Sequence, residues 1–274
     1  LDAVLADAPL PDGFVLTLPK VTSAGQVAAM NLVCAWLESH HGLPAGRLGF
    51  EVQVETAQAI MAPDGAAEVA RIVHAGEGRV TGLHYGTYDY GAALGVSAAE
   101  QRMDHPVADY ATSVMQVAAA QTGVRISHGS TNVLPVGERD AALAAWALHA
   151  RLVRRHLTRG IYQGWDLHPH QLVTRYAATF AFFRSGLDEV FDRLSAYLDS
   201  TEAAAEATDD APAVLDEPAS AVALGGFLLR GLQCGAVAAD EVLAGTGLAA
   251  DGLEALARRQ RPQRAGRPTP GDTP

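Results

Sequence analysis

Residues 79–90 read RVTGLHYGTYDY, an apolar run with β-strand character that ends in glycine, tyrosines and a single carboxylate, Asp89. Four more apolar runs of similar length occur along the chain, and helical patterns fill most of the intervals between them. Alternating strands and helices are typical of parallel strands joined by crossover helices, so the sequence predicts an α/β fold. The predicted strands are Phe14–Leu18, Leu48–Val54, Arg79–Tyr85, Val124–Ser127 and Gly160–Trp165.

Amphipathic patterns predict the helices that connect and follow these strands. Apolar side chains recur in them at three- and four-residue spacing, as one face of a helix requires. The predicted helices cover residues 23–39, 66–74, 109–121, 140–157 and 172–185. The three tryptophans fall on apolar faces and are expected in the core: Trp36, Trp146 and Trp165.

Polar side chains stand where the predicted strands end: Lys20, Glu55, Asp89, and Asp166 with His168. In a (β/α)8 barrel the catalytic residues come from those strand ends, whereas a doubly wound sheet binds its ligand over a switch point. No GxGxxG or GxxxxGK[ST] stretch follows any predicted strand, which disfavours the doubly wound fold. The sequence therefore predicts a (β/α)8 TIM barrel, of which this chain supplies roughly the last five βα units.

Composition divides the chain into four expected parts. Residues 1–186 are the predicted barrel part, and residues 187–213 a helix with an acidic linker. Residues 214–250 are a predicted helical C-terminal segment. Residues 251–274 are a predicted disordered tail, rich in arginine, proline and glycine, that begins with a short helix.

Bulk composition limits the classes of function. The formal net charge of −11 argues against a general nucleic-acid-binding surface, which needs clustered lysine and arginine. No apolar run is long enough to cross a bilayer and no signal peptide is recognisable. Cys34 and Cys234 lie in apolar helical contexts and are expected to be buried free thiols, so a cytoplasmic location is expected. Because Leu1 is not a methionine, we expect the natural chain to begin upstream.

Glu55 and Asp89 are lone carboxylates at the ends of two successive predicted strands. Neighbouring parallel strands lie about 4.8 Å apart, so these side chains can converge, and two unpaired carboxylates that close would repel. A divalent cation would relieve the repulsion, and Mg2+ prefers such oxygen ligands. Alternatively, each carboxylate caps the following helix or pairs with an arginine such as Arg47 or Arg79. Zinc is less suited, because no histidine or cysteine shares this strand end in a ligand pattern.

Five segments occur in an order that resembles the HpcH/HpaI aldolase and citrate lyase β-subunit superfamily. They are LTLPKVTSAGQV, FEVQVETAQAI, GLHYGTYDYGAALG, GWDLHPHQL and VLDEPASAVAL, and they extend from about Gly13 to Leu229. This group includes malyl-CoA and citramalyl-CoA lyases, and pyruvate- and phosphoenolpyruvate-type barrels are related to it. The resemblance implies a TIM barrel with carbon–carbon lyase activity.

The resemblance also implies roles for particular residues. Glu55 and Asp89 match the two acidic ligands of a Mg2+ ion, for which Mn2+ is a substitute. The backbone of Gly86, Thr87 and Tyr88 matches the turn whose amides hold the substrate carboxylate.

Two further site residues follow from the same resemblance. Asp216 matches an aspartate of the C-terminal segment that serves as catalytic acid/base and reaches the site of a neighbouring subunit. The alternative for Asp216 is a helix N-cap, because Asp-Glu-Pro is a good helix start. Lys20 matches the lysine of the family pattern LPKVES and is expected to support the substrate-binding site. His168 and His170, although histidines, are expected to be structural.

The sequence departs from the family pattern in two ways. The family's first three strands, which carry an acidic motif and a substrate-contacting arginine, have no counterpart here, so we infer that this chain is the C-terminal portion of a longer protein. The third motif reads HYGTYDY in place of FGPxDL, which indicates a divergent subfamily. Its three tyrosines, Tyr85, Tyr88 and Tyr90, have no assigned role.

The predicted function is a Mg2+-dependent lyase that cleaves or forms a carbon–carbon bond next to a 2-oxo acid through a metal-stabilised enolate. The expected substrate is a small 2-oxo acid or an acyl-CoA-type adduct, and the expected assembly is a homo-oligomer. No nucleic acid or membrane partner is expected. The alternatives are a malate-synthase-like condensing enzyme and a non-catalytic oligomerising barrel.

Overall fold

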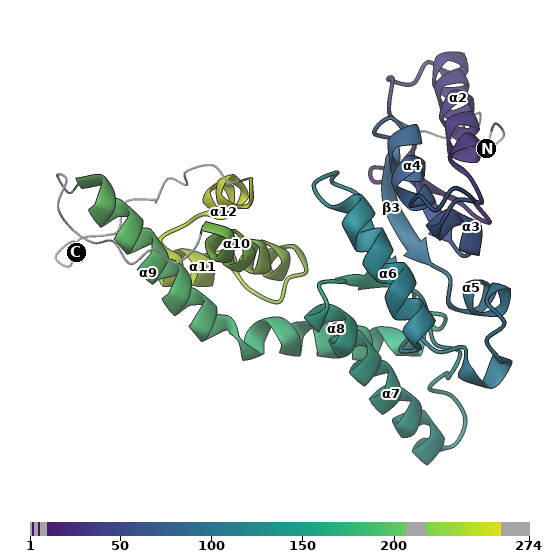
Figure 1. Ribbon diagram of the computed structural model, residues 1–274. Coiled ribbons are helices and arrows are strands. Elements are labelled where there is room, and N and C mark those ends of the chain that lie inside the picture. The colour runs from purple at the N-terminus through teal and green to yellow at the C-terminus, as the bar shows by residue number, and fades with distance from the viewer. Residues whose placement is uncertain (1, 3–4, 6–9, 207–217, 259–274) are drawn as a thin grey trace. The chain divides into compact units, whose positions relative to one another are not determined.

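The computed structural model describes residues 2, 5, 10–206 and 218–258 of the chain (Figure 1). Two compact units make up the chain, Leu1–Arg175 and Tyr176–Pro274. The boundary between them falls inside one helix, α8 (Pro169–Ser185), instead of after residue 186. Asp216 and the residues after 258 lie outside the described ranges.

The first unit contains a five-stranded parallel sheet whose strands lie in the order of the sequence. Consecutive parallel strands that neighbour each other in this order are the arrangement of a (β/α)8 barrel wall. The predicted α/β class and all five predicted strands are confirmed, although the last strand is only two residues long. The strands are β1 (Val15–Leu18), β2 (Gly49–Val54), β3 (Val80–Tyr85), β4 (Arg125–His128) and β5 (Gln163–Gly164).

Helices occupy every interval between these strands. Three of them, α2, α4 and α6, form one layer over the sheet, since α2 packs on α4 and α4 packs on α6 (Figure 1). The short helices α3 and α5, which directly follow the ends of β2 and β3, were not among the predicted elements. The helices of this unit are α2 (Ala24–His41), α3 (Ala57–Ile60), α4 (Glu68–Ala75), α5 (Thr87–Ala93), a 3-10 turn at Ala98–Glu100, α6 (Pro106–Ala119) and α7 (Arg139–Thr158).

The two faces of the sheet differ in polarity. Val52 pairs with Leu83 and Val54 pairs with Tyr85, and all four side chains are buried in the core beneath the helices. Because side chains alternate along a strand, the opposite face carries polar groups. There the Nε2 atom of His84 lies 2.5 Å from a carboxylate oxygen of Glu51, and Arg125 lies 3.8 Å from the same carboxylate.

A buried ion pair joins α2 to the start of β3. The Glu38 carboxylate accepts hydrogen bonds from both terminal nitrogens of Arg79 (2.5 and 2.7 Å) and from the amides of Gly46 and Leu48 (3.0 and 2.7 Å). The hydrogen bonds from Arg79 lower the pKa of Glu38 to about 2. Arg79 is therefore committed to α2 and is not available to the strand-end carboxylates.

Two histidines stack in the interior between β4 and α7. The rings of His128 and His156 lie 3.5 Å apart between centroids at an interplanar angle of 7°, and both are fully buried. Tyr85 meets His128 edge to face at 5.4 Å. Burial holds the pKa of His128 well below 6.5 and lowers the pKa of His156 to about 3, so both rings are neutral in the folded protein.

The second unit is helical. It contains the end of α8, then α9 (Leu187–Glu206), α10 (Pro218–Gln233), α11 (Ala239–Thr246) and α12 (Ala250–Ala257). α10 packs on α9 and α12, and α11 packs on α9. One sequence expectation changes here, because the predicted linker is helical as far as Glu206. The short helix expected beyond Asp251 is present as α12, whose Leu253 and Leu256 bury their side chains in the core of this unit.

Three further expectations can be compared with the structure. None of the helices in the described ranges is both long and apolar enough to cross a membrane. Both cysteines are free, but only Cys34 is buried, while Cys234 is half-buried. None of the three tryptophans expected in the core is buried there: the Trp36 side chain stands on the outer face of α2 and is 59% exposed, and Trp146 and Trp165 are half-buried.

Replacing Arg79 with alanine is expected to lower the free energy of unfolding by about 3–5 kcal/mol, because Glu38 would keep a buried charge without its partner. Arg71→Ala is the matched control, since Arg71 makes ion pairs with Asp64 and Glu68 at a half-exposed position and should cost less than about 1 kcal/mol. Urea denaturation of both variants measures the difference. Equal losses would contradict the special role of the buried pair.

The buried histidine pair predicts acid sensitivity. Between pH 6.5 and about 3 the unfolded chain binds protons on these imidazoles that the folded chain does not bind. The free energy of unfolding therefore falls as the pH is lowered, by about 1.4 kcal/mol per pH unit for each histidine. His156→Phe should reduce this slope by about one histidine's share in urea denaturation between pH 4 and 6. The exposed His74→Gln should leave the slope unchanged, and an unaltered slope in His156→Phe would refute the assignment.

Candidate functional site

The strand-end residues of β1, β2 and β3 meet at the carboxyl edge of the sheet. Lys20 follows β1 by two residues, Glu55 directly follows β2, and Asp89 lies in the first turn of α5, which begins after Gly86 at the end of β3. Since the three strands are parallel neighbours, their ends lie at the same edge of the sheet. This shared edge brings together residues that are far apart in the sequence.

The Lys20 side chain joins the two carboxylates. Its Nζ atom lies 3.6 Å from Oε2 of Glu55 and forms a close ion pair with Asp89. The backbone N–H of Lys20 donates a 2.8 Å hydrogen bond to Oε1 of Glu55. Glu55 and Asp89 thus converge as their positions in the sequence indicated. The positive charge between them comes from the protein itself.

The two carboxylates differ in exposure. Glu55 is only 6% exposed, whereas the side chain of Asp89 is 55% exposed. The hydrogen bond from Lys20 lowers the pKa of Asp89, and the same bond raises the pKa of Lys20. Both charges are therefore retained at neutral pH. Glu55 forms the fixed inner side of the site, and Asp89 faces solvent.

The turns after β1 and β2 are tied to each other. Thr56 caps the N-terminus of α3 by accepting the Ala59 amide at 3.2 Å, and its hydroxyl donates to the Val21 carbonyl at 2.7 Å. Thr56, and not Glu55, is therefore the cap of α3. In the turn after β1, Lys20 has a left-handed backbone (φ 55°), an uncommon conformation for a lysine and one that tends to occur at functional sites.

Gly86 allows β3 to approach Glu55 closely. Its amide donates to the Val54 carbonyl at 3.0 Å, and a Cβ added at this position would lie 2.4 Å from the Cβ of Glu55. Any larger residue would have to push the Glu55 side chain away. The glycine of the GTYD turn is thus required by the neighbouring strand.

Thr87 and Tyr88 attach the start of α5 to the loop after β4. The Thr87 hydroxyl donates to the Ser130 carbonyl at 3.3 Å, and the Tyr88 hydroxyl donates to the same oxygen at 3.4 Å. Gly129 must be small, because a Cβ there would lie 2.1 Å from Oγ1 of Thr87. The amides of Thr87 and Tyr88 belong to the first turn of a helix, where N–H groups have no partner within the helix. Their predicted contact with a substrate carboxylate stays a prediction.

The other two tyrosines of this motif are core residues. Tyr85 and Tyr90 are buried and meet at an angle of 65° with ring centroids 5.5 Å apart. Burial raises the pKa of both hydroxyls. The aromatic character of the third motif therefore has two origins: Tyr85 and Tyr90 fill space under α6, and Tyr88 anchors a loop.

Neither arginine considered as an alternative partner reaches the site. Arg79 binds Glu38, and Arg47 donates to the carbonyl oxygens of Leu10, Phe14 and Pro11. The partner that sequence reasoning missed is Lys20, which was expected only to support the site. Its position directly after a strand end was the available signal.

Asp166, the other strand-end carboxylate, belongs to a separate buried network. Its Oδ1 atom lies 2.9 Å from Nε2 of His149, and Arg175 binds both of its oxygens. Burial alone would raise the pKa of Asp166, but the hydrogen bonds from His149 and Arg175 lower it to about 2. This network joins β5 to α7 and α8. The His170 amide donates to Nδ1 of His168, and the His170 ring contacts the Pro135 carbonyl at 3.3 Å. The His170 carbonyl accepts from Nε1 of Trp146 at 2.8 Å.

The donor set at Lys20, Glu55 and Asp89 fits a hard divalent cation. Two carboxylates supply oxygen ligands, and the lysine ammonium between them demonstrates that a positive charge is favoured at this point. Mg2+ is typically held by one or two carboxylates, with waters and substrate oxygens as the remaining ligands. Glu55 and Asp89 would hold the ion, and Lys20 would have to move away from them.

Comparison with known proteins gives a family and a fold. A family model described as a domain of unknown function (DUF6986) matches residues 1–261. No curated protein matches the sequence. A citrate lyase structure from Burkholderia xenovorans LB400 aligns with a TM-score of 0.59 at 20% identity, over 84% of this chain and 67% of that chain.

Two further structures align less closely. They are the CitE protein of Mycobacterium tuberculosis in complex with magnesium, acetoacetate and coenzyme A (TM-score 0.47, 20% identity, 79% of this chain and 67% of that chain) and RipC from Yersinia pestis (TM-score 0.47, 18% identity, 65% and 67%). The fold likeness therefore rests on the citrate lyase. It agrees with the TIM-barrel fold that the sequence motifs predicted.

The close approach at Gly86 leads to a test. Gly86→Ala should lower the free energy of unfolding by about 1–3 kcal/mol, because the added methyl group meets Glu55 within the packed strand ends. The matched control is Gly186→Ala, where an added Cβ meets nothing within 4 Å and the expected change is within about 0.5 kcal/mol. Urea denaturation of both variants compares them. A neutral Gly86→Ala would contradict the packing described here.

Proposed function

The chain belongs to the DUF6986 family, and on that premise we propose that it is a Mg2+-dependent carbon–carbon lyase that acts next to the oxo group of a 2-oxo acid. The observation that carries the proposal is the convergence of Glu55 and Asp89 on one cationic group at the carboxyl edge of a parallel sheet. Active sites of (β/α)8 barrels lie at that edge. The fold likeness to a citrate lyase supports the same direction.

The proposal gives Glu55 and Asp89 different roles as ligands, because the two carboxylates differ in exposure. Glu55 is buried and held by the Lys20 amide, so it would supply a fixed ligand, while the half-exposed Asp89 would close the site from the solvent side. A bound Mg2+ would supply Lewis-acid stabilisation for negative charge on the oxo oxygen of the substrate. The first-turn amides of Thr87 and Tyr88 would donate to the substrate carboxylate from the same edge of the sheet.

The bond changes define what else the site needs. Cleavage removes the proton of a hydroxyl group on the leaving fragment, converts that fragment to a carbonyl compound, and leaves the bonding electron pair on the carbon next to the oxo group. That carbon then takes up a proton. The family resemblance assigns this proton transfer to Asp216, which lies outside the described residues. In that assignment Asp216 serves a neighbouring subunit, so a homo-oligomer belongs to the proposal.

Lys20 has a role of its own in the proposal. Its ammonium offsets part of the negative charge of the two carboxylates when no other cation is present, and its flexible side chain, already 59% exposed, would swing out when a metal binds. When no metal is bound, the site therefore stays accessible to solvent and keeps its charged side chains. Lys20→Met should consequently tighten divalent-cation binding, because no ammonium has to be displaced.

The proposal is tested through Mg2+ binding and enolisation in the full-length protein. Isothermal titration should detect one Mg2+ or Mn2+ ion whose affinity falls at least about tenfold in Glu55→Gln and in Asp89→Asn. In D2O, proton NMR should detect Mg2+-dependent deuterium exchange at the methyl group of pyruvate, slowed about 10²–10³-fold in both variants. Asp140→Asn, at an exposed carboxylate on α7, is the matched control and should change neither quantity.

Three results would redirect or end the proposal. Consumption of glyoxylate that requires an acyl thioester would indicate a condensing enzyme on the same site. Metal binding that is unaffected by the Glu55 and Asp89 variants would remove the assigned ligands. If pyruvate showed no metal-dependent deuterium exchange, and if Glu55→Gln and Asp89→Asn behaved like the unsubstituted protein, the non-catalytic barrel would be the remaining alternative.

A further inference from the structure

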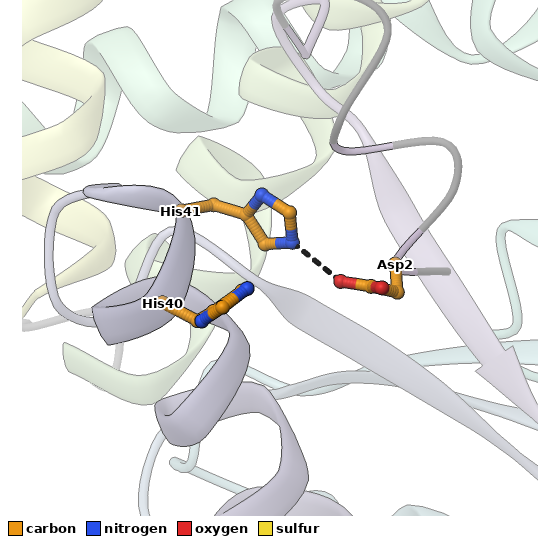
Figure 2. Close-up of side chains that lie close together, drawn as sticks. All are labelled: Asp2, His40 and His41. Carbon is orange, nitrogen blue, oxygen red and sulfur yellow. Dashed lines mark hydrogen bonds and ion pairs between the residues drawn. The ribbon is translucent and has the colours of Figure 1, made fainter.

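A second group of potential metal ligands lies at the opposite end of α2 from Lys20. α2 ends at His40 and His41, and Asp2 lies beside them (Figure 2). One ligand atom from each of the three residues lies within 4.8 Å of the others, and Nε2 of His41 lies 2.8 Å from Oδ1 of Asp2. We propose that Asp2, His40 and His41 bind a first-row transition metal ion of the Zn2+, Ni2+ or Cu2+ class.

The direction of the side chains supports a common ligand. Neighbouring residues of a helix project about 100° apart, so two consecutive histidines do not face one target by default. Here the two rings are nearly perpendicular (89°) with centroids 5.0 Å apart, and both present a nitrogen toward the carboxylate (Figure 2). The helix ends directly afterwards at Gly42, which has a left-handed backbone. Both imidazoles thus face Asp2 at the end of the helix.

The chemistry of the donors selects the class of metal. Two imidazole nitrogens and one carboxylate oxygen suit borderline ions such as Zn2+, whereas Mg2+ prefers oxygen ligands alone. Zn2+ bonds of about 2.0–2.1 Å place tetrahedral donors about 3.4 Å apart, so the observed group needs only side-chain rotations to close. Binding would replace the proton that now joins His41 and Asp2. The ligand set thus differs in kind from that of Glu55 and Asp89.

The surroundings of the three residues make the site accessible and oriented. Asp2 has a 70% exposed side chain, and His40 is also exposed, so an ion can enter from solvent and keep water as its remaining ligands. His41 is more enclosed, with 14% of its side chain exposed. Trp36, one turn earlier on α2, stacks on the His40 ring at 5.0 Å and 8°, which restricts the orientation of that ring. The exposed Trp36 therefore has a role in the proposed site, which is to orient the His40 ring.

Trp36 also provides a readout that does not depend on any activity. Cu2+ or Ni2+ bound at His40 would quench Trp36 fluorescence by contact, and Zn2+ added afterwards would compete and restore it. Isothermal titration with Zn2+ should give one site in the full chain. Trp36→Phe should abolish most of the quenching and retain Zn2+ binding in the titration.

Single variants of the ligands test the assignment. His40→Gln, His41→Gln and Asp2→Asn should each weaken Zn2+ binding at least about tenfold. His74→Gln, at an exposed histidine in the last turn of α4, is the matched control and should leave binding unchanged. Glu55→Gln and Asp89→Asn should also leave it unchanged, which separates this site from the proposed Mg2+ site. Equal weakening in His74→Gln, or unchanged Zn2+ affinity in all three ligand variants, would overturn the proposal.

Discussion

The buried carboxylate of Glu55 connects the parts of the molecule on which the candidate site depends. It accepts the amide of Lys20 from the turn after β1, and its side chain lies against Gly86 at the end of β3. Three strand ends are thereby positioned around one acidic group. A shift of one residue in the pairing of β2 with β3 would turn every side chain of the shifted strand to the opposite face. The register Val54 with Tyr85 is therefore a condition for the site as well as for the core.

The way in which a carboxylate of this protein is paired depends on how far it and its partner are buried. Glu38 is buried and Asp166 is largely enclosed, and each has an arginine that binds both of its oxygens. Moving a charge from water into the protein interior costs free energy, so each of these carboxylates needs its arginine, and the ion pair does not open. Glu55 and Asp89 instead share one flexible lysine, and Asp89 is open to solvent. Their negative charge is partly compensated by the Lys20 ammonium, which can move away on its flexible side chain. That difference separates a site with capacity for a ligand from a structural ion pair.

Much of the fold could be predicted because it follows from local patterns. The strands were found from short apolar runs, and α2 and α7 from helical spacing that extends over many residues. The errors lie where a local pattern is ambiguous. Trp36 occupies an apolar stretch of α2, yet that part of the helix faces solvent. The acidic, alanine-rich stretch after residue 200 is compatible with either a linker or a helix, and α9 continues through it to Glu206.

Some features of the candidate site are written in the chain itself: two carboxylates and a lysine at strand ends, a glycine where β3 stops, and adjacent histidines where α2 stops. Residue type and local periodicity suffice for these. Their partners are different. Lys20 contacts both carboxylates, Arg79 binds Glu38, and Asp2 contacts the end of α2, each across 35 or more residues of sequence. Such contacts depend on strand register and helix packing, which no local pattern encodes, so only the folded chain decides them.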